Sequence, residues 1–138
     1  MNHQDDSFKR LKSMAMQACG NAYSPYSKFS VGAAVIDDGG NAFAGCNVEN
    51  ASFGMTQCAE RNAIAAAIAA GCGAGSLTTL VIYTPGDTVH PPCGACRQVM
   101  HEMMAIGSRV ISCCDGDGIR EWARHEHLPD AFEFPDNR

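Results

Sequence analysis

The sequence predicts a three-layer α/β/α domain with a mixed central sheet. Helical and strand-like segments alternate after an initial hairpin, an order typical of a sheet with helices on both faces. Residues 77–84 form a nearly continuous apolar run, Leu-Thr-Thr-Leu-Val-Ile-Tyr-Thr, as expected for a buried central strand. The chain of 138 residues shows no internal repeat and no dividing linker. We therefore expect residues 1–138 to form one domain that is large enough to bury a core.

The first part of the chain is predicted to form a helix and then a hairpin. Apolar residues recur at helical spacing over residues 7–19, and the Gly-Asn pair at 20–21 is a stop signal. The Asp-Gly-Gly turn at 38–40 separates two strand-like segments, 29–37 and 41–48. This pattern predicts two antiparallel strands joined by a tight turn.

A second helix is predicted from Thr56, a plausible cap, to Gly71. It is rich in alanine, and Ile64 and Ile68 are its only large apolar anchors. Alanine is the best helix former, and its small side chain permits close approach of a neighbouring element. The segment is therefore either a tightly packed central helix or a contact between subunits, and the sequence favours the first interpretation.

The second half of the chain continues the alternation. A proline-bearing loop at 85–92 leads into a helix predicted over 94–105. A strand at 109–114 and a turn at 115–118 follow. A last short helix is predicted around 121–127, before a C-terminal tail.

Composition and charge argue against two classes of partner. Hydrophobic residues make up 46% of the chain and charged residues 18%, as in ordinary globular proteins. The formal net charge is -5 and no window carries a basic run, which argues against binding to nucleic acid. The N-terminus lacks a secretory pattern, and no apolar segment is long enough to span a bilayer. We expect a cytoplasmic protein without a nucleic-acid or membrane partner.

Eight cysteines could indicate a disulfide scaffold, but such scaffolds are small, secreted and short of core. In a cytoplasmic chain, closely spaced cysteines more often bind metal. Five of the eight are interpreted as small buried apolar residues: Cys19, Cys46, Cys72, Cys113 and Cys114.

The remaining cysteines have the spacing of a metal site. Cys93 and Cys96 are separated by two residues, which places both sulfurs on one face of a helical turn. Tetrahedral zinc, with sulfur at about 2.3 Å, needs sulfurs roughly 3.8 Å apart. Cys58 would be the third ligand. Three protein ligands leave the fourth position open for water, as in a catalytic zinc site.

A structural zinc site remains an alternative for the Cys93 and Cys96 pair alone, because His90 and His101 lie nearby and could supply a further ligand. The Cys58-Ala59-Glu60 segment favours a catalytic site instead. Positions two apart in mid-helix point to nearly opposite sides, so Cys58 and Glu60 can serve one site only beyond the helix end. The histidines are expected to face solvent: His3, His90, His101, His125 and His127.

Cys-Ala-Glu at 58–60, followed by Pro-Cys-x-x-Cys at 92–96, resembles the signature of the zinc-dependent cytidine deaminases. Three further stretches resemble the family in the same order, at 23–34, 45–54 and 128–132. The likeness is to the short, homotetrameric, three-cysteine type. It implies a cytidine deaminase-like fold, one Zn²⁺ per chain, and hydrolysis of cytidine and deoxycytidine to uridine and deoxyuridine in pyrimidine salvage.

The resemblance also implies roles around the metal. A zinc-activated water would attack C4 of the base, with Glu60 as the proton shuttle and ammonia as the leaving group. Three thiolates give the zinc site a net charge near minus one. Arg61 would offset this charge by hydrogen-bonding ligand sulfurs, although it could also be an ordinary surface arginine.

Substrate contacts follow from the same resemblance. Asn47 and Glu49 would hold the ribose 3′-hydroxyl. Their side chains point the same way because they are two positions apart on an extended segment. Phe29 would lie against the pyrimidine ring. The Ala59 amide would meet the base carbonyl, and the Pro91 carbonyl would accept the leaving amine. The last three residues could instead be simple packing residues.

Family members of this type complete each site across subunits. By resemblance, neighbouring chains would contribute four residues, Ala51, Ser52, Phe53 and Phe132. Phe53 stands where tyrosine is commoner, so any contact of a phenol hydroxyl would be lost.

Three rival functions remain open at this point. A polynucleotide-editing deaminase predicts a basic groove, which the acidic balance disfavours. A deaminase of a nucleoside analogue, of the blasticidin type, would share the same motifs. A non-catalytic zinc-binding module predicts a closed site with four ligands and no purpose for Glu60.

Overall fold

Five strands form one mixed sheet at the centre of the structure, a computed structural model that describes residues 3–135. The strand order is β2-β1-β3-β4-β5. Strand β3 is parallel to β4, and all other neighbouring pairs are antiparallel. The strands are β1 (Gly32–Asp37), β2 (Ala42–Cys46), β3 (Leu77–Tyr83), β4 (Met104–Cys113) and β5 (Ile119–Ala123).

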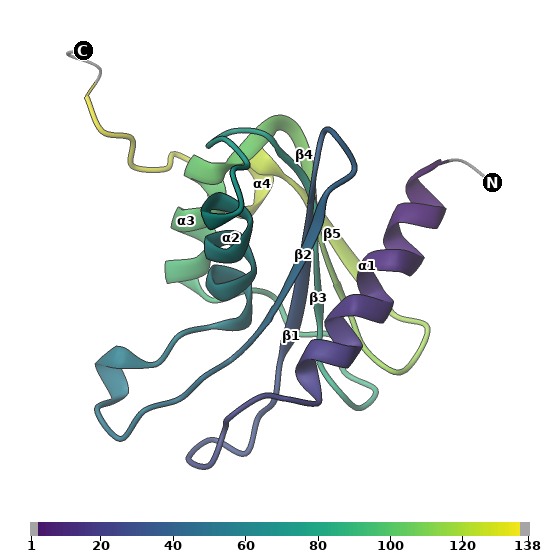
Figure 1. Ribbon diagram of the computed structural model, residues 1–138, viewed down its shortest axis with the longest axis vertical. Coiled ribbons are helices and arrows are strands. Elements are labelled where there is room, and N and C mark those ends of the chain that lie inside the picture. The colour runs from purple at the N-terminus through teal and green to yellow at the C-terminus, as the bar shows by residue number, and fades with distance from the viewer. Residues whose placement is uncertain (1–2, 136–138) are drawn as a thin grey trace.

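Helices cover both faces of the sheet (Figure 1). One face carries α1 (His3–Cys19), and the other carries α2 (Ala59–Ala69) and α3 (Gly94–Met103), with the short α4 (Arg124–His127) packed beside α3. The predicted three-layer α/β/α architecture is therefore confirmed. No helix within residues 3–135 combines the length and apolar character needed to cross a membrane.

The core consists of two layers that share the sheet. Along β1, Ala33 and Val35 point into the cluster under α2 and α3, whereas Ala34 and Ile36 point into the cluster under α1. Successive side chains of a strand alternate between faces, so a strand covered on both sides must be apolar throughout. This explains the continuous apolar run of β3, which is also divided between the two clusters.

Small residues let α2 lie close to the sheet. A side chain at Gly45 of β2 would place its Cβ 2.5 Å from the backbone nitrogen of Ala63. Ala59, Ala63 and Ala67 form the buried face of the helix, in agreement with the tightly packed interpretation. The alanines at 65, 66, 69 and 70 remain exposed on the opposite face.

Several element boundaries differ from the prediction. Helix α1 begins at His3, before the predicted start at residue 7, and α2 begins at Ala59 with Cys58 as its N-cap. Thr56 is therefore not the cap; its hydroxyl accepts a hydrogen bond from the Asn50 amide at 3.2 Å. Helix α3 ends at Met103, and β4 follows at once from Met104.

The predicted first strand, 29–37, is also too long. Residues 29–31 precede β1 because the side chain of Asn47, rather than a neighbouring strand, satisfies the Val31 amide and the Phe29 carbonyl. The returning strand ends at Cys46, and Val48 makes only isolated bridges to Tyr23 and Gln57.

The helix predicted around 121–127 is wrong in its first half, which belongs to β5. Strand β5 is an edge strand that carries Arg120 and Glu121, and charged residues are common on sheet edges. Glu121 pairs with Arg109 of β4, and Trp122 packs against the core under α2 and α3.

The five cysteines interpreted as apolar fall into two groups. Cys19, Cys113 and Cys114 are buried, as predicted, whereas Cys46 and Cys72 are half-buried.

Candidate active site

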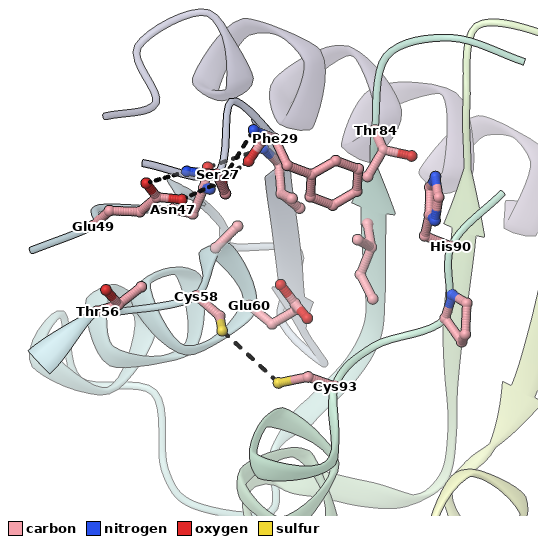
Figure 2. Close-up of a pocket in the computed structure, with 14 residues that line it drawn as sticks. Ser27, Phe29, Asn47, Glu49, Thr56, Cys58, Glu60, Thr84, His90 and Cys93 are labelled. Atoms are coloured by element: carbon pink, nitrogen blue, oxygen red, sulfur yellow. Dashed lines mark hydrogen bonds between the residues drawn. The ribbon is translucent and has the colours of Figure 1, made fainter. Parts of the chain in front are cut away.

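Two helix N-termini converge on three cysteines. Cys58 is the N-cap of α2, Cys93 is the N-cap of α3, and Cys96 lies in the first turn of α3. Their sulfurs all lie within 4.8 Å of one another, and the Cys58 and Cys93 sulfurs are 3.8 Å apart (Figure 2). This separation is the edge of a tetrahedron around zinc with Zn–S bonds of about 2.3 Å.

The surroundings of the sulfurs favour thiolates. Helix N-termini carry partial positive charge, and the first-turn amides of α2 and α3 lie beside the three cysteines. A hydrogen bond from Cys96 contributes most to lowering the pKa of the Cys58 thiol, and a hydrogen bond from Arg61 lowers it further. The Nη2 atom of Arg61 donates to the Cys58 sulfur and to the Thr56 carbonyl, each at 3.4 Å.

These residues fit a zinc ion. Thiolates are soft ligands that select zinc in proteins, and their spacing suits tetrahedral coordination. Within residues 3–135, no histidine or carboxylate joins the three sulfurs, so His90 and His101 do not supply a fourth ligand. Cys58 and Cys93 also line a cavity, so a metal ion held by the three sulfurs would border a space that a small molecule can enter.

Glu60 shares this cavity. It lies in the first turn of α2 with only 5% of its surface exposed. Burial raises the pKa of its carboxyl group, and the negative charge of Cys58 adds to the effect. Although Glu60 is two residues from Cys58, both side chains reach the same space because they lie at the helix end (Figure 2).

The cavity has a volume of about 250 Å³. Cys58, Cys93 and Glu60 form one side, and Phe29, Thr84 and His90 form another (Figure 2). A second hollow of about 330 Å³ shares Ser27, Glu49 and Thr56 with the first. Ala59 and Pro91 also line the first cavity, so all five predicted substrate-binding residues adjoin it: Phe29, Asn47, Glu49, Ala59 and Pro91.

Asn47 holds the segment that leads into β1. Its Oδ1 accepts a hydrogen bond from the Val31 amide at 2.9 Å, and its Nδ2 donates to the Phe29 carbonyl at 2.8 Å. The side chain is 8% exposed. Asn47 thus lines the cavity and also holds residues 29–31 in place as part of its wall. The spacing between Asn47 and Glu49 in the sequence does not predict this second role.

Glu49 anchors the turn before Phe29. Its carboxylate accepts hydrogen bonds from the backbone amides of Tyr26 and Ser27, at 2.9 and 3.1 Å, and from the Ser27 hydroxyl. The Ser27 hydroxyl is the main reason that the pKa of Glu49 is lowered, and the two amides add to it. The carboxylate therefore stays charged at the cavity edge.

Three histidines do not face solvent as predicted. His101 and His127 are buried, and His90 lines the cavity with its ring against Phe29. His125 is exposed as predicted, while the structure describes the backbone of His3 but not its side chain. His90 lies in the loop three residues before Cys93, and this closeness in sequence could have indicated that it lies near the candidate metal site.

None of the four residues assigned to neighbouring subunits lines the first cavity, although Phe53 lines the second hollow. Ala51, Ser52 and Phe53 are exposed, and Phe53 contacts Tyr26 edge-on with ring centroids 5.6 Å apart. Phe132 is 69% exposed, and its carbonyl accepts a hydrogen bond from Gln98 at 3.0 Å.

Comparison with known proteins identifies the class. Residues 5–113 match the cytidine and deoxycytidylate deaminase zinc-binding region, so the chain belongs to this family of zinc-binding deaminases. It is 43% identical to the cytidine deaminase of Halalkalibacterium halodurans over 125 residues, which cover 88% of this chain and 91% of the relative. It is 39% identical to the cytidine deaminase of Mycobacterium tuberculosis over 132 residues, or 96% and 94% of the two chains.

Solved structures agree with the fold. The crystal structure of cytidine deaminase from Burkholderia pseudomallei superposes with a TM-score of 0.85 at 40% identity, covering 96% of this chain and 100% of that one. Cytidine deaminase from Mycobacterium tuberculosis superposes with a TM-score of 0.76 at 39% identity, covering 91% and 97%. The predicted family and the cytidine deaminase-like fold are confirmed.

Proposed function

We propose that this chain catalyses the hydrolytic deamination of cytidine and deoxycytidine to uridine and deoxyuridine, with release of ammonia. One observation carries the proposal: three thiols cluster at two helix N-termini, and two of them, Cys58 and Cys93, line a small cavity together with the buried Glu60. The relatives named above are cytidine deaminases, and the matches extend over nearly the whole of both chains.

Cys58, Cys93 and Cys96 would hold the zinc ion. Zinc supplies Lewis acidity at an open coordination position, which makes an attacking water nucleophilic near neutral pH. A non-catalytic zinc module would need a fourth protein ligand, and the described residues offer three. The three-ligand arrangement supports the catalytic proposal over that alternative.

Glu60 would move the protons. It would accept one proton of the attacking water and deliver it to N3 of the base, while a C–O bond forms at C4. It would then pass the second proton to the 4-amino group, and the C4–N bond breaks to release ammonia. The water thus provides the new carbonyl oxygen of uridine and both transferred protons. Burial of Glu60 keeps these transfers away from bulk water.

The cavity lining supports a nucleoside rather than a nucleotide. Its acidic members are Glu49 and Glu60, and no lysine or arginine is among its lining residues. Within this lining, a 5′-phosphate would meet negative charge without a cation to pair with. We assign the ribose 3′-hydroxyl to Asn47 and Glu49, and the face of the base to Phe29.

Backbone groups would complete recognition of the base. The Ala59 amide would donate to the base carbonyl, and the Pro91 carbonyl would accept from the leaving amine. Both residues line the cavity together with Cys58 and Cys93. Backbone contacts of this kind fix the orientation of a ligand without requiring a particular side chain.

The assembly that we propose is a homotetramer with shared sites. Ala51, Ser52, Phe53 and Phe132 would then approach a neighbouring cavity. Their exposure, together with the exposed alanine face of α2, supports this arrangement. Sedimentation of the purified protein should give a mass of about four chains; a monomer that is fully active would overturn the shared-site proposal.

The central test is an ultraviolet assay for loss of cytidine, with ammonia measured in parallel. We expect turnover of cytidine and deoxycytidine, loss of turnover on removal of zinc, and recovery when zinc returns. Deoxycytidine monophosphate, single-stranded DNA and blasticidin serve as competing substrates. Preference for any of these over cytidine would overturn the assignment, and absence of ammonia release from every substrate would overturn the enzymatic proposal.

A further inference from the structure

Phe29 stands in the cavity on a well-anchored backbone. Its amide donates to the Ser27 hydroxyl at 3.0 Å, and its carbonyl accepts from Asn47 at 2.8 Å. The preceding residue, Lys28, adopts a left-handed conformation with a φ of 59°, which is uncommon for a residue other than glycine. The backbone therefore directs Phe29 toward the cavity by several independent constraints.

The ring of Phe29 is less constrained than its backbone. It is 42% exposed and belongs to neither apolar cluster of the core. A half-exposed phenyl ring that packs on no core surface can change rotamer readily. Some other contact must hold it if it is to present one face to a ligand.

His90 provides that contact. Its ring meets the Phe29 ring edge-on, with centroids 5.0 Å apart and an interplanar angle of 82°. Aromatic pairs favour this arrangement because the positive edge of one ring meets the negative face of the other. Figure 2 shows the two side chains next to each other on the same side of the cavity, although they come from segments far apart in the sequence.

The loop that carries His90 is held at both ends. Near its start, the Gly86 amide donates to the Asp115 carboxylate at 2.7 Å. Near its end, the Arg97 guanidinium donates to the Pro92 carbonyl at 2.8 Å. His90 is outside the cluster of candidate metal ligands, so its ring is available for the contact with Phe29.

We propose that His90 is a positioning residue that fixes the Phe29 ring against the pyrimidine base. The inference rests on the proposed function, because it assigns the base to the face of Phe29. His90 acts through Phe29 and takes no part in proton transfer. A contact that holds the base equally in the bound substrate and in the transition state affects KM and leaves kcat nearly unchanged.

The test compares three substitutions of His90 in the zinc-loaded protein. His90→Ala should raise KM for cytidine about threefold to tenfold, as expected for the loss of one aromatic pair. The value of kcat should stay within about twofold of the wild type. His90→Phe keeps an aromatic edge and should restore KM, whereas His90→Asn keeps polarity without a ring and should behave like His90→Ala.

Two controls separate this role from a general structural one. His125→Ala removes an exposed imidazole from the same chain and should leave KM unchanged. Thermal unfolding and zinc content should match the wild type for all the His90 variants. Reduced zinc content in the His90 variants would overturn the positioning role, because it would show that His90 instead supports the loop that carries Cys93.

A double variant tests whether His90 works through Phe29. If it does, the increases in KM caused by Phe29→Leu and His90→Ala should not multiply in the combined variant. Multiplying effects, an unchanged KM in His90→Ala, or rescue by asparagine but not phenylalanine would each overturn the inference. Absence of cytidine turnover in the wild type is a different outcome, since it would overturn the proposed function itself.

Discussion

Arg61 and Cys58 form a direct contact at the start of α2, where the Nη2 atom lies 3.4 Å from the sulfur. The same nitrogen donates to the Thr56 carbonyl, also at 3.4 Å. The guanidinium is thus tied to the backbone before the helix and to the thiol at its N-cap. A fixed cation beside a thiol of a three-cysteine site offsets the negative charge that three thiolates bring to a zinc ion.

Replacing Arg61 should weaken the metal site without unfolding the chain. We expect Arg61→Gln to lower zinc affinity or turnover by about 10- to 100-fold, the usual effect of losing a group that supports a metal ligand. Competition with a coloured chelator measures the affinity. Arg120→Gln, on edge strand β5, is the matched control and should retain zinc like the wild type. Equal zinc affinity and turnover in Arg61→Gln would show that the contact is incidental.

Glu60→Gln separates metal binding from proton transfer. The amide has nearly the same shape as the carboxylate but is no longer an effective base, so zinc should be retained while turnover falls by about 100-fold or more. Zinc content by elemental analysis and the ultraviolet assay on one preparation check both parts. Substantial remaining turnover would remove Glu60 from the mechanism.

Periodicity made most of the fold predictable. Strands β1 and β3 are covered by helices on both faces, so their residues must be apolar on both faces. This requirement produces a continuous apolar run in the sequence. Strand β5 was missed for the opposite reason. It lies at the sheet edge and carries Arg120 and Glu121, so its sequence lacks the apolar pattern that indicates a buried strand.

The candidate site was predictable only where chemistry constrains spacing. Two cysteines of one helical turn and a Cys-Ala-Glu segment indicate a metal and a base from residue type alone. The contact of His90 with Phe29 depends on how two distant segments meet in space, and neither segment carries a local pattern for it. The use of Asn47 to replace strand pairing at residues 29–31 is equally non-local.

Gly45 should be essential for the approach of α2 to the sheet. A Cβ atom there would lie 2.5 Å from the Ala63 nitrogen and 2.8 Å from the Ala59 carbonyl oxygen, both parts of the helix backbone. We expect Gly45→Ala to lower the free energy of unfolding by about 1–3 kcal/mol because the backbone must shift. Urea unfolding measures the change. Gly73→Ala is the matched control, since among the described residues only its own sequence neighbours could lie within 4 Å of a Cβ built there. Equal stability of the two variants would contradict the expectation.

Glu49 should make the stability of the protein depend on acid pH. Hydrogen bonds from the Ser27 hydroxyl and from two backbone amides lower the pKa of Glu49 in the folded state below its ordinary value of 4.5. A lowered folded-state pKa means that the charged carboxylate stabilises the fold at pH values above 4.5. This contribution disappears as the pH falls through the folded-state pKa, because both states are then protonated.

Glu49→Gln removes that titration and provides the comparison. The difference in free energy of unfolding between the wild type and Glu49→Gln should be constant from pH 7 to about pH 5 and should shrink below that. Urea unfolding at a series of pH values measures it, and Asp38→Asn, in the exposed turn between β1 and β2, is the control variant. A difference that stays constant down to pH 3 would show that the hydrogen bonds to Glu49 do not favour its charged form. The same variant should raise KM for cytidine if the carboxylate also binds the ribose, so both measurements bear on one side chain.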